Sequence, residues 1–253
     1  VKRLRAIRYP QDRLEICLVV EQGDGPTATA LKQAGLPVGW RVVEVPRGTV
    51  RPKPRALNYG LDFLRGEIIG VYDAEDAPEP DQLLKVAAKF ATSPPQVACL
   101  QGRLAFYNAR RNWLARWFAV DYAAWFGVVL PGLARMGFVI PLGGTTLFFR
   151  RAALEALGRW DAHNVTEDAD LGLRRARIGL RTEMVDTVTR EEANCRMVPW
   201  IKQRSRWIKG YALTYIVHMR RPWMLFRNLG AKKFFGVQAL FLGSVTLFLL
   251  APF

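Results

Sequence analysis

The chain has 253 residues, half of them hydrophobic, so it is long enough to bury a substantial core and too apolar for an intrinsically disordered segment. Its formal net charge of +15 suits nucleic acid, an anionic membrane surface or phosphate-bearing substrates, and charge alone does not choose among these partners. The three cysteines, Cys17, Cys99 and Cys195, are far apart and lack metal-type spacing, which argues against a disulfide framework and fits a reducing compartment or plain burial.

Strand-like apolar runs alternate with helix-like segments along the first half of the chain. Residues 14–21 (LEICLVVE) form the first run, and a turn-rich stretch separates it from the helical segment TATALKQA. Further strands are expected at residues 40–45, 68–72 and 97–101, with helices beginning near Arg55 and Asp81. This alternation predicts an α/β fold with a doubly wound, mostly parallel sheet flanked by helices, whose ligand lies at the carboxyl ends of the strands.

A first acidic cluster, Asp73-Ala74-Glu75-Asp76, follows the third expected strand. Carboxylates two residues apart at a strand end point the same way, so Asp73 and Glu75 can converge on Mg²⁺ or Mn²⁺ and leave positions open for phosphate oxygens. A solvated acidic turn that caps the next helix explains the same residues equally well.

A second acidic cluster, Glu167 and Asp168, follows Thr166 at the start of a helical pattern that ends at Gly179. Thr166 is a suitable N-cap, and carboxylates in a first helical turn are favoured by the helix dipole, so pure capping is one interpretation. The functional alternative is a general base at the mouth of a site, a role open to Asp168 or Glu167.

A third cluster lies in an amphipathic stretch at residues 199–218. Gln203, Arg206 and Trp207 are three and four residues apart and share one helix face. Arginine can hold a departing diphosphate through charge-assisted hydrogen bonds, and a tryptophan plane is a platform for a sugar ring. A basic helix lying on a membrane, with its tryptophans at the interface, is the alternative.

The C-terminal segment is apolar enough to cross a membrane. Residues 234–253 carry no charge over about twenty positions, and basic residues precede them at Arg220, Arg221, Arg227, Lys232 and Lys233. Such a flank favours the cytoplasm, so the catalytic part is expected to face it. A buried core helix is the alternative for this segment.

The basic, aromatic segment at residues 101–133 is equally compatible with a membrane interface, an acceptor chain or core packing.

Taken in order, a strand ending in an acidic residue, KPRALN, DAED, TED and QRSRW before a hydrophobic segment resemble the processive family 2 glycosyltransferases. That family includes the cellulose, hyaluronan and chitin synthases and their bacterial relatives. The resemblance implies a GT-A fold and an inverting transfer of a sugar from a nucleotide sugar, expected to be UDP-linked, to a growing polysaccharide at the cytoplasmic face of the inner membrane. It also implies Mg²⁺ or Mn²⁺, membrane lipids as partners and no nucleic acid.

The resemblance also implies roles for single residues. Asp168 matches the catalytic base, and Asp73 and Glu75 match the two acids that hold the metal. Trp207 matches the acceptor platform. Gly144 lies in a turn that either lets the acceptor approach the backbone closely or is an ordinary turn before the next strand, LFFRR. The positions that match nucleotide-sugar contacts are Glu21, Lys53, Asp73, Gln203 and Arg206. Glu21 and Glu75 depart from the family pattern because aspartate is usual at both places.

The expected organisation is a catalytic domain at residues 1–198 that lacks its first nucleotide-binding strand, interface helices at 199–230 and a transmembrane helix at 231–253. Two other functions are weighed against polysaccharide synthesis. One is a non-processive transferase that adds a single sugar to a lipid or short acceptor. The other is a non-enzymatic basic protein that binds membranes or nucleic acid, which the charge supports but which does not explain acids clustered after strands.

Overall fold

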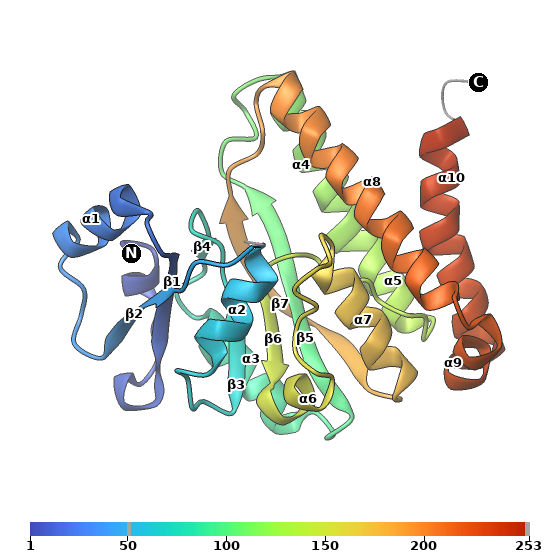
Figure 1. The fold of residues 1–253 in the computed structure, drawn as a ribbon, viewed down its shortest axis with the longest axis horizontal. Coiled ribbons are helices and arrows are strands. Elements are labelled where there is room, and N and C mark those ends of the chain that lie inside the picture. Colours follow the sequence, from blue (N-terminus) through green and yellow to red (C-terminus); the bar gives the residue numbers. More distant parts are fainter. Residues whose placement is uncertain (50–51, 251–253) are drawn as a thin grey trace.

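The computed structural model describes residues 1–49 and 52–250 and contains two sheets. Strands β1 (Ile16–Glu21) and β2 (Trp40–Val45) form a small parallel sheet, joined by α1 (Gly25–Gln33). The larger sheet has five strands, in the order β3 (Ile68–Val71), β6 (Leu147–Arg150), β5 (Val97–Phe106), β7 (Arg181–Glu191) and β4 (Ala77–Pro78). Figure 1 shows the large sheet between the small sheet and the C-terminal helices.

The α/β class is confirmed, but the expectation of a doubly wound, mostly parallel sheet is wrong. In the large sheet only β5 and β7 pair in parallel, and the other three pairings are antiparallel. The physical reason is β6, whose four residues insert between β3 and β5 and run against both. Leu147, Phe148 and Phe149 of β6 are buried on the two faces of the sheet, so the side chains of this antiparallel strand form part of the hydrophobic core. The sheet is therefore mixed.

Helices cover both faces of the large sheet. On one face, Leu147 and Phe149 pack with side chains from α2 (Lys53–Leu61), α6 (Arg151–Ala156) and α7 (Glu167–Arg177). On the other, Phe148 packs with α3 (Gln82–Thr92). The alternation of side chains along β6 thus joins two hydrophobic clusters through one strand.

The remaining helices form a second region beside the sheet. α4 (Trp113–Ala124) continues through a π-helical turn, η3 (Trp125–Val129), into α5 (Leu130–Arg135). α8 (Met197–Met219) carries the QRSRW motif, and α9 (Pro222–Val237), η4 (Gln238–Leu242) and α10 (Gly243–Leu250) follow it. The N-terminal residues hold two 3-10 turns, η1 (Leu4–Ala6) and η2 (Gln11–Arg13).

Within the described residues, one helix is long and apolar enough to cross a membrane by length and composition, and it runs from Trp113 to Arg135. It lies in the segment for which membrane contact and core packing were both open, and it shows features of each. Leu114 and Phe118 are buried, whereas Trp113 and Trp117 are 66% and 64% exposed.

The C-terminal segment expected to span a membrane is helical as far as Leu250, and residues 251–253 lie outside the described part. Val237 and Phe241 are fully buried beside α7, while Leu247 and Phe248 are exposed. A transmembrane role for this segment stays a prediction.

Candidate active site

The carboxyl end of β3 and the first turn of α2 bring three of the expected site residues together. The Lys53 ammonium lies 2.6 Å from a carboxylate oxygen of Asp73 and donates a hydrogen bond of 3.1 Å to the backbone carbonyl of Gly144. Burial alone would lower the pKa of Lys53, but the negative charges of Asp73 and Asp168 outweigh it, and the net pKa is raised. Lys53 is therefore a firmly protonated cation among carboxylates.

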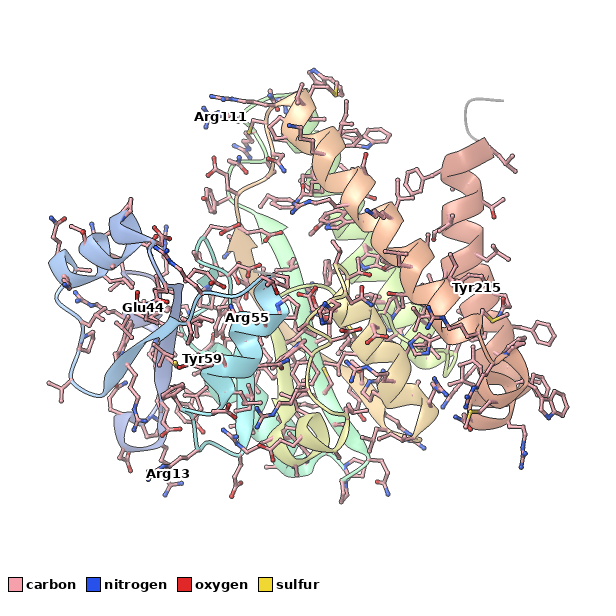
Figure 2. The ribbon with its side chains drawn as sticks, in the orientation of Figure 1. Arg13, Glu44, Arg55, Tyr59, Arg111 and Tyr215 are labelled. Atoms are coloured by element: carbon pink, nitrogen blue, oxygen red, sulfur yellow. The ribbon has the colours of Figure 1, made fainter. Side chains whose placement is uncertain are left out.

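Glu21 lies apart from this group, at the end of β1. One of its carboxylate oxygens is 3.6 Å from the guanidinium of Arg55, which projects from α2 (Figure 2). Both Glu21 oxygens and the Arg55 Nη1 atom are buried without a hydrogen-bond partner among the described residues. The pair thus joins the small sheet to the helix that carries Lys53.

The acidic loop after β3 is arranged differently from the expectation. Glu75 is exposed, whereas Asp76 is only 5% exposed. The Asp76 Oδ2 atom accepts hydrogen bonds from the Asp73 backbone N–H at 2.8 Å and from the Thr145 hydroxyl at 2.5 Å. Its other oxygen, Oδ1, is buried and has no hydrogen-bond partner in residues 1–49 and 52–250, and burial raises the pKa of Asp76 to about 6. Asp76 therefore organises the loop, a role that the spacing of Asp73 and Glu75 did not indicate.

A strained loop at residues 143–146 forms the opposite side of the site. The buried Gln101 amide donates to the carbonyls of Thr145 and Thr146, and its oxygen accepts from the Gly143 N–H at 2.9 Å. Thr146 has a φ of 55°, which is costly for a β-branched residue. Gly144 has a φ of 32°, and a Cβ there would lie 3.8 Å from the Asp168 Oδ2 atom. The loop thus brings the Gly144 backbone against Asp168.

Glu167 and Asp168 occupy the first turn of α7 and are 6% and 7% exposed. Burial raises the pKa of both carboxyl groups, and the neighbouring Glu167 raises that of Asp168 further. Thr166 sits at the N-cap position, but its side chain makes no capping hydrogen bond and contacts Asn164 and Thr214 instead. A buried carboxylate with a raised pKa is a stronger base than an exposed one, which suits proton removal from a hydroxyl group.

Glu191 is an acidic residue of the site that the sequence did not reveal. It is the last residue of β7 and projects from the same side of the strand as Thr187 and Thr189. Burial, together with the negative charges of Asp76 and Asp73, raises the pKa of Glu191 to about 8. An acid at a strand end is the signal that singled out Asp73, but β7 was not among the expected strands.

The three residues expected on one face of α8 differ in their surroundings. The Gln203 side-chain oxygen accepts a 2.7 Å hydrogen bond from Asn194, and Arg206 is exposed. Trp207 packs beside Phe118 and Tyr122 of α4, with ring centroids 6.1 and 6.3 Å apart. Trp207 also lies one turn from Gly210, which contacts Thr166 at the start of α7. The helix therefore runs past the acidic centre.

Arg204, inside the same motif, joins α8 to α4. It forms an ion pair with Asp121, and its guanidinium lies over the rings of Phe118, Trp207 and Trp200 at 4.9 to 5.5 Å. This contact fixes the aromatic wall on which Trp207 sits. A central basic residue in the motif thus packs the two helices together, whereas Arg206 is exposed.

The carboxylates of the acidic loop are compatible with a divalent cation. Across residues 1–49 and 52–250, no three His, Cys, Asp or Glu side chains converge as a preformed metal cage would require. Mg²⁺ commonly binds through one or two carboxylates and the oxygens of a substrate diphosphate, which needs no such cage. The Oδ1 atom of Asp76, which has no hydrogen-bond partner within the described part of the chain, and the exposed carboxylate of Glu75 are oxygen donors of the kind such an ion takes.

Comparison with known proteins gives one family and a consistent set of relatives. The family described as glycosyl transferase family group 2 matches residues 68–253. A beta-monoglucosyldiacylglycerol synthase of Synechocystis sp. is 30% identical over 243 residues, which are 92% of this chain and 48% of that protein. The probable glycosyltransferase YdaM of Bacillus subtilis is 25% identical, over 83% of this chain and 50% of that protein. The chain spans about half the length of these two relatives.

Other relatives and two solved structures extend the comparison. A probable glucomannan 4-beta-mannosyltransferase of Arabidopsis thaliana is 29% identical over 147 residues, 58% of this chain and 26% of that protein. The mannosyltransferase PcManGT from Pyrobaculum calidifontis, in complex with GDP-Man and Mn²⁺, has a TM-score of 0.68 at 20% identity. The match covers 99% of this chain and 76% of the PcManGT chain. S. aureus TarS 1–349 in complex with UDP-GlcNAc has a TM-score of 0.63 at 14% identity, and the match covers 98% of this chain and 70% of the TarS chain. The fold is thus GT-A-like.

Proposed function

Because the chain belongs to glycosyl transferase family group 2 and is therefore an enzyme of the hexosyltransferase class, we propose that it transfers one sugar from a nucleotide sugar to a hydroxyl group of a membrane lipid. The observation that carries this proposal is the buried centre in which Asp168, with its raised pKa, lies beside Lys53 and Gly144. Membership of an enzyme family removes the alternative of a non-enzymatic basic binder.

In the proposed reaction, Asp168 takes the proton of the acceptor hydroxyl as its oxygen attacks the anomeric carbon of the donor sugar. The bond from that carbon to the nucleotide diphosphate breaks on the opposite face, so the anomeric configuration inverts. Lys53 and Arg206 offer positive charge to the departing diphosphate, which gains negative charge as the bond breaks. Glu167, buried beside Asp168, is the second carboxylate in reach of this role.

The other proposed roles divide between donor and acceptor. Glu21 contacts the nucleotide base and Gln203 the donor, while Trp207 supports the acceptor and the Gly144 backbone approaches it closely. Asp73 and Glu75 would hold Mg²⁺ or Mn²⁺, which when bound neutralises negative charge on the diphosphate. The PcManGT complex with Mn²⁺ supports a divalent ion in this fold.

A lipid acceptor is supported by the match over 92% of the chain to a beta-monoglucosyldiacylglycerol synthase. The apolar helix from Trp113 to Arg135 supports a membrane location because Val120 and Val128 are 67% and 71% exposed on it. We place the catalytic part at the cytoplasmic face of the inner membrane because basic residues immediately precede the apolar C-terminal segment. The second candidate is processive polysaccharide synthesis, which the glucomannan mannosyltransferase relatives favour.

The experiment is incorporation of radiolabelled sugar by membranes that contain the whole protein. UDP-glucose, UDP-GlcNAc and GDP-mannose are supplied in turn, with Mn²⁺ or with EDTA, and the Asp168→Asn variant is the matched control. We expect label in the organic phase, one sugar for each lipid molecule, lost with EDTA and in the control. Label in a long water-soluble polymer would favour the second candidate. No Asp168-dependent label with any donor would refute both.

A further inference from the structure

A polar stripe on α8 holds this helix against α7. Gly210, Thr214 and His218 are four residues apart on one face of α8 and are all buried. A Cβ at Gly210 would come within 2.3 Å of the Thr166 side chain, so the two backbones approach closely there. The Thr214 hydroxyl accepts a 3.0 Å hydrogen bond from Asn164 and lies 3.3 Å from that of Thr166. The stripe therefore begins at the first turn of α7.

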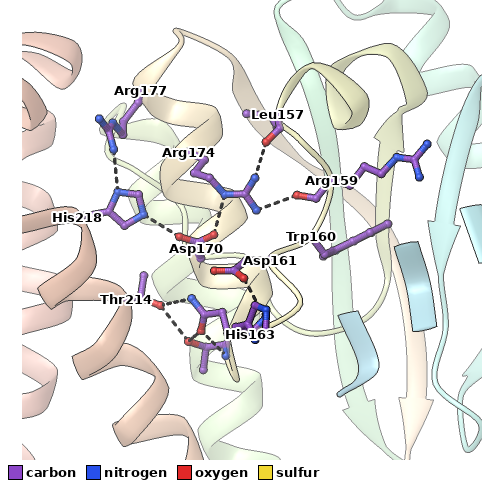
Figure 3. A network of polar contacts seen from close by, with 12 residues as sticks. Leu157, Arg159, Trp160, Asp161, His163, Asp170, Arg174, Arg177, Thr214 and His218 are labelled. Carbon is purple, nitrogen blue, oxygen red and sulfur yellow. Dashed lines mark hydrogen bonds and ion pairs between the residues drawn. The ribbon is translucent and has the colours of Figure 1, made fainter. Parts of the chain in front are cut away.

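His218 ends the stripe with a buried hydrogen bond to Asp170 (Figure 3). Its Nε2 atom is 2.8 Å from the Asp170 Oδ1 atom, and each residue is only 5% exposed. The second Asp170 oxygen accepts from Arg174 at 2.7 Å, and the Arg174 guanidinium also donates to the carbonyls of Leu157 and Arg159. Burial would raise the pKa of Asp170, but the hydrogen bond from His218 and the charge of Arg174 outweigh it, and the net pKa is lowered. Asp170 is therefore a stable carboxylate anchor.

The contact between α7 and α8 depends on directional hydrogen bonds, unlike a purely apolar contact. An apolar face permits one helix to slide or turn on another at little cost, whereas a slipped buried hydrogen bond leaves both partners unpaired. A slip by one helical turn would shift α8 by about 5.4 Å and break the contacts of Thr214 and His218 together. The stripe thus permits one register between the helices.

This register matters because the two helices carry opposite sides of the proposed centre. Asp168 lies two residues before Asp170 on α7, and Arg206 and Trp207 lie on the same helix as His218. Both helices are continuous between these positions, so a displacement at the contact between α7 and α8 is transmitted to the centre.

We propose that His218 is a positioning residue for sugar transfer: through Asp170 it fixes α8 on α7 and so sets Arg206 and Trp207 against Asp168. This inference rests on the proposed function. His218 does not contact the reacting atoms. Its loss should therefore lower the rate of transfer more than it weakens donor binding, although Gln203 and Arg206 on the same helix contact the donor.

The test uses His218→Ala in the whole protein, with rescue by free imidazole. A hollow of about 360 Å³ adjoins His218, so an imidazole molecule has room to enter. Its lining also includes Gly158, Asp161, Val217 and the charged side chains of Asp170, Arg174 and Arg177. We expect kcat to fall about 10- to 100-fold, while donor KM and nucleotide Kd rise by less than about five-fold. Imidazole should restore at least about a tenth of the lost rate. His163→Ala removes the exposed histidine of the neighbouring loop and should leave the kinetics unchanged.

The outcomes separate this inference from the proposed function. Failure of the proposed function appears in the wild-type protein, as no transfer to any acceptor. If wild type transfers sugar, an unchanged kcat in His218→Ala, a parallel loss of donor affinity, or no imidazole rescue would overturn the positioning role. If the alanine variant does not fold, His218→Gln replaces it, because the glutamine amide can donate to Asp170. That variant is expected to keep kcat within about five-fold of wild type, and a larger loss at unchanged thermal stability would overturn the proposal.

Discussion

Glu191 offers a test of the acidic centre that requires no substrate. Burial raises its pKa from the usual 4.5 to about 8, so the folded protein holds a proton that the unfolded chain releases. A group with a raised folded pKa contributes stability that is fully present below pH 4.5 and is lost as the pH rises through about 8. The glutamine of Glu191→Gln does not titrate, so the free energy of unfolding of this variant does not fall as the pH rises through about 8. The variant should therefore be more stable than wild type at high pH.

The magnitude follows from the two pKa values. The gap between 4.5 and about 8, at about 1.4 kcal/mol for each pH unit, corresponds to roughly 4 to 5 kcal/mol. Glu191 is only partly buried, and solvent screening reduces this to about 2 to 3 kcal/mol. For a domain of this size that is a gain of about 5 to 10 °C in Tm above pH 8, and almost none near pH 4.5.

The assay is thermal unfolding from pH 4.5 to pH 9 in detergent, without divalent cation, which would neutralise the carboxylates, and without nucleotide, which would stabilise the folded state by binding to it. Glu192→Gln is the matched control because Glu192 is half exposed and pairs only loosely with Arg111, at 3.8 Å. Its Tm should follow wild type at every pH. A Glu191→Gln variant that is no more stable than wild type above pH 8, or equally stabilised at all pH values, would refute the account of a buried, repelled carboxylate.

Three further predictions concern transfer. Asp168→Asn should lower kcat by about 10² to 10⁴-fold and leave nucleotide binding, measured by calorimetry, largely intact; full turnover would remove Asp168 from the mechanism. Arg206→Ala should lower turnover at saturating donor by about 10-fold or more, and an unchanged kcat would count against its contact with the leaving group. Gly102→Ala places a Cβ 2.5 Å from the Thr146 side chain, so we expect a loss of about 1 to 3 kcal/mol in unfolding free energy together with weaker transfer; wild-type Tm and activity would contradict the close packing beneath residues 143–146.

The sequence predicts those elements whose signal is local. Strands β1, β2 and β3 appear where continuous apolar runs indicate them, and α7 begins directly after Thr166. Asp73, which its position after a strand singled out, meets Lys53, which the resemblance alone indicated, and the Gly144 backbone approaches Asp168. Elements of this kind depend on residues close together in the sequence, so a local pattern is enough to predict them.

Features that depend on distant contacts could not be predicted in this way. The direction of β6 depends on how the chain returns from α5, and nothing within its four residues specifies an antiparallel pairing. The place of Asp76 in the loop after β3 depends on Thr145, because the carboxylate that accepts the Asp73 N–H also accepts from the Thr145 hydroxyl, 69 positions further along the chain. Likewise Arg204 resembles any exposed arginine of an amphipathic helix until α4 covers it.

Asp168 and Asp170 show how one short helix can supply both chemistry and support. They lie two residues apart on α7 and are about equally buried, yet their pKa values are shifted in opposite directions. Asp168 is buried beside another carboxylate, so it binds a proton more readily than usual, as a general base must. Asp170 is paired with His218 and Arg174, so it remains charged and holds its neighbours in place. Divergent pKa values at similar burial identify which carboxylate is free to react. A paired Asp170 also keeps α7 fixed while its neighbour changes protonation state, so one helix can present a reactive base without losing its position.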